Sequence, residues 1–190
     1  ITITPAIANI TDAQVTQVNN IAAALTGTVE ASIDGNVAQL DDLAANSTSA
    51  TCAFTIVVDD VATVTQGKTI IDATSAATVD FSAAGLTGAL ATYIADGANT
   101  AHASLTAIKG KDADINITIT PAIENITDAQ VIQVNNIAAE TEGTVTASID
   151  GNAAQLDDLA ANATSATCAF TIVVDDVATV AQGKTIIDAT

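Results

Sequence analysis

The sequence contains no tryptophan, methionine or arginine, and it has only three phenylalanines and one tyrosine among its 190 residues. Its hydrophobic residues, 49% of the chain, are therefore mostly Ala, Val, Ile and Leu. A core of such small side chains brings backbones close together, which suits thin stacked layers better than a thick core around a ligand cavity. The hydrophobic share is large enough for a packed core, so we predict a folded chain.

Positive charge is also scarce. Four lysines stand against 22 Asp and Glu residues, which gives a formal net charge of -18. Because phosphate backbones are bound by clusters of Lys and Arg, this balance argues against nucleic acid as a partner. Anionic lipid surfaces are disfavoured for the same reason. An acidic surface keeps a protein soluble and tolerates salt, since counterions screen its self-repulsion.

No hydrophobic run reaches the roughly 18 residues that cross a bilayer, so we predict no membrane insertion. The beginning of the sequence shows neither a charged region followed by a hydrophobic stretch nor an initiator Met. Ile1 also lies at an interior point of a repeat. We therefore expect a mature product or a window onto a longer protein.

The sequence repeats itself. Residues 1–74 match residues 117–190 at 65 of 74 positions without a gap, and ITITPAI opens both copies. This organisation predicts a first full repeat unit at 1–116, made of a duplicated part (1–74) and a unique part (75–116). A second, truncated unit follows at 117–190, and we expect both to form one continuous solenoid. Below, residues 1–74 are the first copy and residues 117–190 the second copy.

Helical and strand patterns take turns within one unit. Thr11 and Gln14 have capping-box spacing and precede an apolar stripe, which predicts a helix. Alternation over Thr28–Asp34 predicts a half-buried strand, and a second helix is expected after Gly35. Another strand is expected over Ala53–Asp60, with Phe54, Ile56 and Val58 pointing inward.

The remainder of the unit is predicted in the same way. A connection over Val61–Gly67 would lead to a strand at Lys68–Thr74, and a helix is expected near Ala83–Ala95. A strand at Ala101–Ile108 and a turn at Lys109–Asp114 would then lead into a strand at Ile115–Thr120.

Five strands in 116 residues give about 23 residues per strand and return, within the range of leucine-rich-type repeats. Helical returns imply parallel neighbouring strands. We therefore predict an α/β fold, a right-handed parallel β/α solenoid with leucine-rich-repeat-like coils. Tandem β-rich sandwich domains are the alternative, which the capped helices and the scarcity of hairpin dipeptides disfavour.

The candidate metal site is Asp112, Asp114 and Asn116, whose D-x-D-x-N spacing begins an oxygen-rich calcium loop. The pattern then departs from such a loop, because Ile117 replaces the expected Gly and Ile123 the expected Glu. A solvated turn is the alternative. The pairs Asp41-Asp42 and Asp59-Asp60 are further candidates for cation binding, or else a polar helix face and a strand end that caps the next segment.

The other reactive residues give no catalytic signature. His102 is the single imidazole, and Ser104 is expected on the same strand face, but no carboxylate partner can be assigned. Gly67-Lys68-Thr69 ends like a phosphate loop, yet Ala62 stands where that loop needs its first Gly. Cys52 and Cys168 occupy equivalent positions, too distant in a solenoid to pair with each other, so we predict buried thiols or a bond to a neighbouring chain.

Several segments together resemble modules of giant repetitive cell-surface and haemolysin-like secreted proteins of marine cyanobacteria and other bacteria. They are ITDAQV (Ile10–Val15), TGTVEASIDG (Thr26–Gly35), IDATSAATVDF (Ile71–Phe81) and LTGALATYIADG (Leu86–Gly97). The resemblance implies secretion, a structural or adhesive role and, frequently, calcium. The G-G-x-G-x-D nonapeptides of the calcium-binding members are absent from this sequence.

These observations predict an extracellular or cell-surface structural protein, without enzymatic activity, whose repeat modules stack end to end with copies of themselves into a filament, rod or surface layer. The alternative is an adhesin or ligand-binding surface module that uses calcium. Near-identical copies favour the structural role, because uniform stacking requires uniform surfaces. The nine differences include Ala8 to Glu124, Ala24 to Glu140 and Thr26 to Glu142, and they are typical of surface drift or of a tuned lateral contact.

Overall fold

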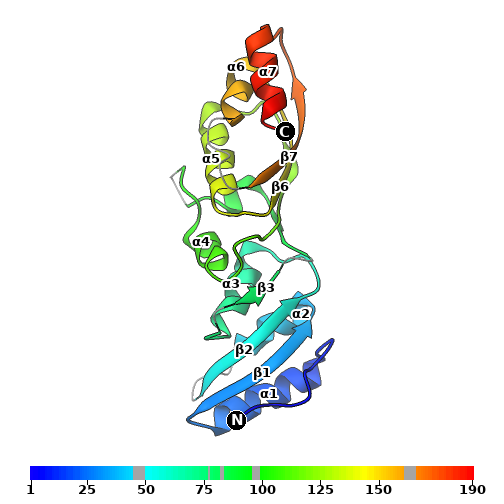
Figure 1. Cartoon of the computed structure of the whole chain (residues 1–190), viewed down its shortest axis with the longest axis vertical. Helices are drawn as coiled ribbons and strands as arrows, with labels where there is room; N and C mark the ends of the chain where they lie inside the picture. Colours follow the sequence, from blue (N-terminus) through cyan, green and yellow to red (C-terminus); the bar gives the residue numbers. More distant parts are fainter. Residues whose placement is uncertain (45–49, 77, 82–83, 96–98, 161–165) are drawn as a thin grey trace. The chain divides into compact units, whose positions relative to one another are not determined.

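Parallel strands alternate with helices in the computed structural model of the chain (Figure 1), which describes residues 1–44, 50–76, 78–81, 84–95, 99–160 and 166–190. The chain divides into two compact units. The N-terminal unit comprises Ile1–Leu86 with Gly110–Asp112, and the C-terminal unit comprises Thr87–Lys109 with Ala113–Thr190. The fold is therefore α/β, and each unit is described by itself below.

The N-terminal unit contains a parallel sheet in the order β1-β2-β3. Residues Thr2 and Ile7 add isolated parallel bridges to the free edge of β1. Its elements are α1 (Asp12–Ala24), β1 (Thr28–Gly35), α2 (Val37–Leu40), the 3-10 helix η1 (Asp41–Ala44), β2 (Thr51–Val58), α3 (Val64–Asp72) and β3 (Val79–Asp80).

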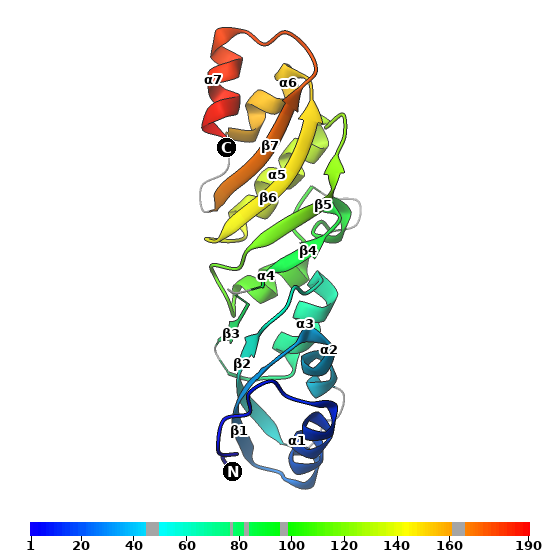
Figure 2. The same ribbon diagram turned by 90° about the vertical axis from the view of Figure 1, so that its right-hand side faces the viewer.

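In the C-terminal unit the second copy repeats this arrangement, and the sheet order is β4-β5-β6-β7 (Figure 2). Leu86, the first residue of β4, is counted with the N-terminal unit. The elements are β4 (Leu86–Gly88), η2 (Leu90–Thr92), α4 (Ala103–Lys109), β5 (Ile117–Ile123), α5 (Asp128–Ala139), β6 (Thr144–Gly151), α6 (Ala153–Leu156), η3 (Asp157–Ala160), β7 (Thr167–Val174) and α7 (Val180–Asp188).

Capping boxes begin the longer helices. The Thr11 side chain accepts a hydrogen bond from the Gln14 N–H, and the Gln14 side chain binds the Thr11 N–H in return. This confirms the predicted first helix. Thr63 and Gln66 form a second capping box, so helix α3 replaces the strand predicted at Lys68–Thr74, which was wrong. Both boxes recur in the second copy at Thr127 and Thr179.

Two predictions in the unique part were also wrong. The segment predicted as a helix near Ala83–Ala95 contains strand β4 and the short η2 and no α-helix in its described part, while Ser82, Ala83 and residues 96–98 lie outside the described residues. Gly85 explains this, because its φ of 73° is not helical. The segment predicted as a strand at Ala101–Ile108 contains helix α4, which buries Leu105 and Ile108 at helical spacing.

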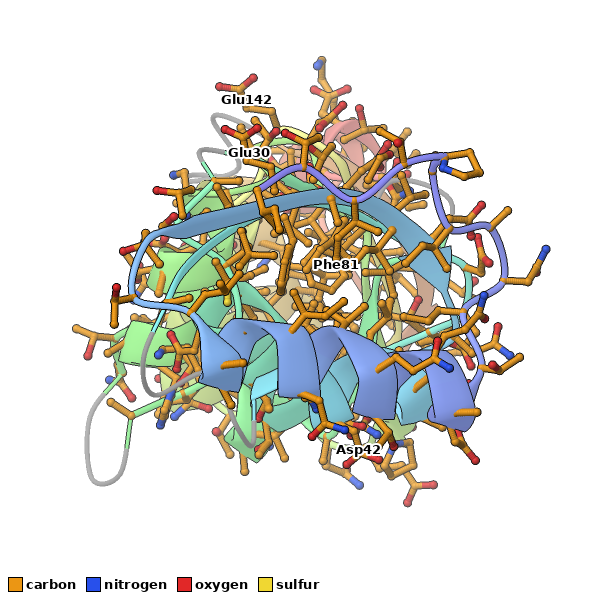
Figure 3. All side chains as sticks on the ribbon, turned by 90° about the horizontal axis from the view of Figure 1, so that it is seen from below. Glu30, Asp42, Phe81 and Glu142 are labelled. Carbon is orange, nitrogen blue, oxygen red and sulfur yellow. The ribbon has the colours of Figure 1, made fainter. Side chains whose placement is uncertain are left out.

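Each sheet buries one face against helices and leaves the other exposed. Burial alternates along β1, where Val29, Ala31 and Ile33 are buried. The prediction that Phe54, Ile56 and Val58 point inward is confirmed. In Figure 3, which looks along the strand and helix layers from one end, Phe81 projects between the two layers, Glu30 points outward on the strand side and Asp42 on the helix side. A two-layer unit of this kind suits a core of small side chains.

Strands β1 to β3, and likewise β6 and β7, follow one another with a constant register, whereas β5 pairs with β6 at an interval of 28 and then 26 residues. Each residue of β1 pairs with the residue 23 positions later in β2, and β6 and β7 have the same relation. Strand β3 continues it, because Ile56 pairs with Val79. Parallel pairing in both sheets and the helices between strands make the β-rich sandwich alternative wrong.

Hydrogen bonds outside the sheets follow the same interval of 23 residues. The Asn19 side chain donates to the Asp42 carbonyl at 3.1 Å, and the Val37 N–H donates to the Asp60 carboxylate at 2.6 Å. Asn135 and Ala153 make the equivalent bonds in the second copy. Successive strand-and-return segments of one copy therefore contact each other through equivalent positions. No helix within the described ranges is long and apolar enough to cross a membrane.

Candidate functional site

The surface formed by β7 and α7 is hydrophobic and open. It contains a groove of about 470 Å³, and we call this groove, together with the exposed Val180 at the first position of α7, the end face. The residues that line the groove are Phe170, Ile172, Val174, Asp176, Ala178, Gly183, Ile186, Ile187 and Thr190. An exposed hydrophobic patch with a polar rim is typical of a protein interaction site.

The first copy shows that the same residue types are buried elsewhere in the chain. Val174 is 38% exposed and Ile187 is 72% exposed, whereas their equivalents Val58 and Ile71 are 0% and 5% exposed. Because the residues that line the groove are identical in the two copies, their own sequence does not cause the difference. Residues outside the first copy must provide the cover.

The segment that follows the first copy supplies part of this cover. Strand β3 pairs with β2, and the Ser75 N–H donates to the Cys52 carbonyl at 2.7 Å. The Thr74 hydroxyl, which is buried, accepts from the Phe54 N–H at 2.8 Å. Thr190, the equivalent of Thr74, is exposed and its hydroxyl donates to the Ile187 carbonyl instead. The edge of β2 is therefore paired with β3, whereas the equivalent edge of β7 has no neighbouring strand in the described part of the chain.

Sequence reasoning missed Val180 and Ile187, because it assigned the equivalent of α7 to a connection and a strand. The capping-box spacing of Thr179 and Gln182 was the signal that would have placed these residues on a helix.

Carboxyl pairs stand where the buried strands end. Asp34 lies near the end of β1, and Asp59 directly follows β2. A hydrogen bond with the Asp34 carboxyl raises the pKa of Asp59, and burial and repulsion from Asp34 and Asp60 act in the same direction. The second copy repeats the arrangement, because Asp150 raises the pKa of Asp175 in the same way.

The third carboxylate of each cluster caps a helix. The Asp60 side chain accepts from the Val37 N–H, and the Asp176 side chain accepts from the Ala153 N–H at 2.8 Å. Asp59-Asp60 is therefore a strand end with a capping role, but the helix that Asp60 caps is the earlier α2 and not the next segment, α3, which Thr63 caps, so that part of the prediction was wrong. In the pair Asp41-Asp42, burial and repulsion from Asp42 raise the pKa of Asp41.

The carboxyl pairs predict a specific pH dependence. The pKa of the Asp59 carboxyl is raised in the folded state, so the protonated carboxyl stabilises the fold. This contribution is complete below the unfolded pKa of 3.8, and it is lost as the pH rises through the raised pKa of the folded state. The amide of Asp59→Asn can donate to Asp34 at any pH. We expect this variant to melt at a slightly higher temperature than the unsubstituted chain at pH 7. Between pH 7 and pH 4, its melting temperature is expected to increase less than that of the unsubstituted chain, as measured by circular dichroism.

The second copy offers a replicate and a control for that measurement. Asp175→Asn is expected to behave like Asp59→Asn, because both pairs have the same geometry. Glu124→Ala removes one exposed charge and restores the residue that the first copy has at position 8. If Glu124→Ala flattened the pH profile equally, general charge repulsion and not the carboxyl pair would be the cause.

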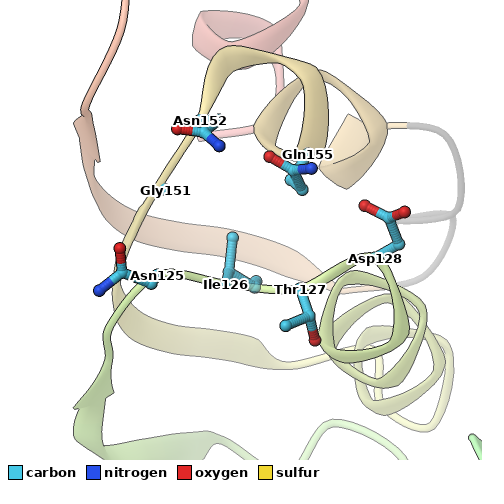
Figure 4. Close-up of a pocket in the computed structure, with 7 residues that line it drawn as sticks. All are labelled: Asn125, Ile126, Thr127, Asp128, Gly151, Asn152 and Gln155. Carbon is cyan, nitrogen blue, oxygen red and sulfur yellow. The ribbon is translucent and has the colours of Figure 1, made fainter.

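A smaller pocket of about 300 Å³ lies beside the carboxyl end of β6 (Figure 4). Asn125, Thr127 and Asp128 line it from the start of α5, and Asn152 and Gln155 from the α6 side. The Gln155 Oε1 atom is buried and has no hydrogen-bond partner in the described part of the chain.

The first copy contains the same polar side chains. There the Gln39 amide donates to the Asp12 carboxylate at 3.0 Å, so the equivalent side chains are bridged. The pocket of the second copy is therefore a polar surface hollow whose side chains have structural counterparts in the first copy.

The predicted calcium ligands belong to different units, with Asp112 in the N-terminal unit and Asp114 and Asn116 in the C-terminal unit. Asp112 is buried, and its carboxylate accepts from the Phe81 N–H at 2.6 Å. The Asn116 side chain accepts from the Thr144 N–H at 2.9 Å, and Asp114 is exposed. Two of the three side chains therefore hold backbone in place, and calcium binding stays a prediction.

No group of three or more His, Cys, Asp and Glu side chains in the described ranges is arranged to hold a metal ion. The two cysteines are thiols; Cys52 is buried, as predicted, and Cys168 is half-buried. Burial raises the pKa of Cys168.

His102 and the phosphate-loop-like triplet have structural roles. The Ser104 N–H donates to the His102 Nδ1 atom at 3.1 Å, and the His102 carbonyl accepts from the Leu105 N–H. His102 therefore caps the start of α4. Gly67, Lys68 and Thr69 lie inside helix α3, where Lys68 forms an exposed ion pair with Asp72 at 2.5 Å. A phosphate loop needs open backbone N–H groups, which a helix interior does not offer.

Comparison of the chain with protein-family models, with curated proteins and with solved structures gave no match in any of the three searches.

Proposed function

We propose that the chain is a structural module of an extracellular or cell-surface assembly, in which strand-and-return coils stack into a right-handed parallel β/α solenoid and modules join end to end. The end face carries this proposal. Its Val174, Val180 and Ile187 side chains are exposed, although the first copy buries the same residue types. Further protein of the same kind would remove this hydrophobic surface from water.

The architecture of the sheets supports the proposal. Parallel sheets normally have both faces covered by helices. Here β1 and β6 each alternate between buried residues and exposed polar ones, so one face of each sheet meets solvent. A solenoid accommodates this arrangement, since every coil contacts only its neighbours along the axis. The interval of 23 residues from β1 to β2, from β2 to β3 and from β6 to β7 lies within the repeat lengths of such coils.

The charge of the chain is consistent with this role. A net charge of -18 opposes association through the charged parts of the surface, and the end face is hydrophobic by contrast. The resemblance to repetitive cell-surface proteins supports secretion, and calcium would then be available to screen the acidic surface. The proposed partners are copies of the same repeat.

Electron microscopy and sedimentation of the purified chain test the proposal. We expect assemblies that grow with protein concentration and whose axial spacing reflects strands about 4.8 Å apart, or roughly 24 Å for five coils. Val180→Asp places a charge on the end face and is expected to shorten the assemblies. Monodisperse monomers over the whole concentration range would contradict the proposal.

A further inference from the structure

We infer that the end face binds a strand segment with the sequence of residues 75–88, supplied by a further copy of the repeat unit. This inference rests on the proposed function, because it names the partner that the open end receives. The N-terminal unit provides the template, because β3, which lies within this segment, pairs with β2 of the first copy.

The template shows which side chains anchor the segment. Strand β3 runs parallel to β2, with Val79 opposite Ile56 and Asp80 opposite Val57. Val79 and Phe81 are 1% and 0% exposed, so both are core residues of that unit. An incoming segment would therefore place a valine and a phenylalanine into the groove between β7 and α7.

Backbone hydrogen bonds fix the register of the segment in the template. The Ser75 N–H donates to the Cys52 carbonyl at its beginning, and the Ala62 N–H donates to the Gly85 carbonyl at 3.1 Å near its end. Cys168 and Ala178 are the equivalents in the second copy. Strand addition at an open sheet edge uses backbone bonds for affinity and side-chain pockets for specificity.

The second copy preserves the groove. All nine residues that line it are the same as their counterparts in the first copy, including Phe170 for Phe54 and Ile186 for Ile70. Within residues 157–190 the two copies differ only at exposed Ala181 and at position 163, which lies outside the described residues. The end face of the second copy therefore has the same side chains as the groove of the first copy, against which β3 is held.

A synthetic peptide with the sequence of residues 75–88 tests the inference directly. With a fluorescent label at its end, it is expected to show saturable anisotropy on titration with the full chain. Hydrogen exchange of the complex is expected to slow at Ala178 and along β7. A peptide with Val79→Asp and Phe81→Asp is expected to bind at least tenfold more weakly.

The chain supplies a matched pair of variants. Ile187 lines the groove and is 72% exposed, whereas its buried equivalent Ile71 is 5% exposed. Val177 is 96% exposed, and its equivalent Val61 stays 51% exposed in the first copy. Because Ile187 and Val177 are both exposed, replacing either of them with Asp leaves the core unchanged. We expect Ile187→Asp to weaken peptide binding tenfold or more and Val177→Asp to change it less than twofold.

A longer variant keeps the test decisive if the free peptide binds weakly. The chain extended at its C-terminus by the sequence of residues 75–112 presents the segment at high local concentration. It is expected to melt at a higher temperature than the unextended chain and to protect the Ala178 amide. The inference is overturned if neither the peptide nor the extension protects this amide, or if both Asp variants bind the peptide equally.

The same experiments separate this inference from the proposed function. Assemblies that form while the peptide neither binds nor shortens them would leave the structural role intact and reject this partner. Specific peptide binding by a chain that stays monomeric, even with the extension, would support the partner and reject the end-to-end role.

Discussion

Gly143→Ala is expected to destabilise the C-terminal unit by roughly 3 kcal/mol. A Cβ atom at Gly143 would lie 2.1 Å from the Asp114 carbonyl oxygen and 2.6 Å from that of Ile115. Both atoms are backbone, so rotation of a side chain cannot relieve the overlap. The segment is also held in place, because the Glu142 N–H donates to the Ala113 carbonyl at 2.7 Å. Urea denaturation followed by circular dichroism measures the loss.

Gly27→Ala is the control, since Gly27 is the equivalent glycine of the first copy. A Cβ atom there would meet nothing within 4 Å. We expect a change in the free energy of unfolding of less than about 1 kcal/mol, because the substitution mainly restricts the unfolded chain. Equal losses at both glycines would show that intrinsic backbone preference, and not the close approach of residues 114–115, determines the effect.

Local signals in the sequence predicted much of the first half of the repeat. The capping box at Thr11 and the alternation after Thr28 each depend on neighbouring residues, and both elements formed as predicted. Thr63 and Gln66 carry the same capping spacing. The strand prediction at Lys68–Thr74 failed because the β-branched residues were given more weight than the cap. The predicted average of about 23 residues per strand agrees with the interval between β1 and β2, although two of the five strands on which it was based, Lys68–Thr74 and Ala101–Ile108, fall on helices α3 and α4.

The differences between the copies were harder to interpret from sequence. Drift at exposed positions accounts for Glu124, but Thr141, which replaces Leu25, is fully buried. Its hydroxyl donates to the Ile115 carbonyl at 2.5 Å and accepts from the Gly143 N–H. Residues 113–115 precede the second copy, and their contacts explain the change. Such a contact joins positions 26 residues apart, which one sequence without relatives does not reveal.

The candidate site shows a similar limit. Sequence comparison showed that residues 117–190 match residues 1–74 of the unit. It did not identify Val180 and Ile187 as exposed. The equivalent residues of the first copy, Val64 and Ile71, are buried, and residues outside α3 contribute to that burial. Identical side chains in the two copies therefore differ in environment.

Val64→Asp is expected to cost about 4 kcal/mol, the second large effect, because it places a carboxylate in a buried position. Val64 is 5% exposed at the first turn of α3. Burial would raise the pKa of the new carboxyl, so its neutral form is favoured in the folded state. The loss is therefore expected to be largest at pH 7 and smaller near pH 4, as measured by urea denaturation at both pH values.

Val180→Asp is the same substitution in the second copy, at a residue that is 93% exposed and begins an equally capped helix. In dilute solution, where the end face is open, we expect it to change stability by less than about 0.5 kcal/mol. In assemblies, or in the chain extended by the sequence of residues 75–112, we expect Val180→Asp to destabilise the protein as much as Val64→Asp does. If Val180→Asp remained neutral under those conditions, the cover over α7 would differ from the cover over α3, and the two ends of the repeat would not be equivalent.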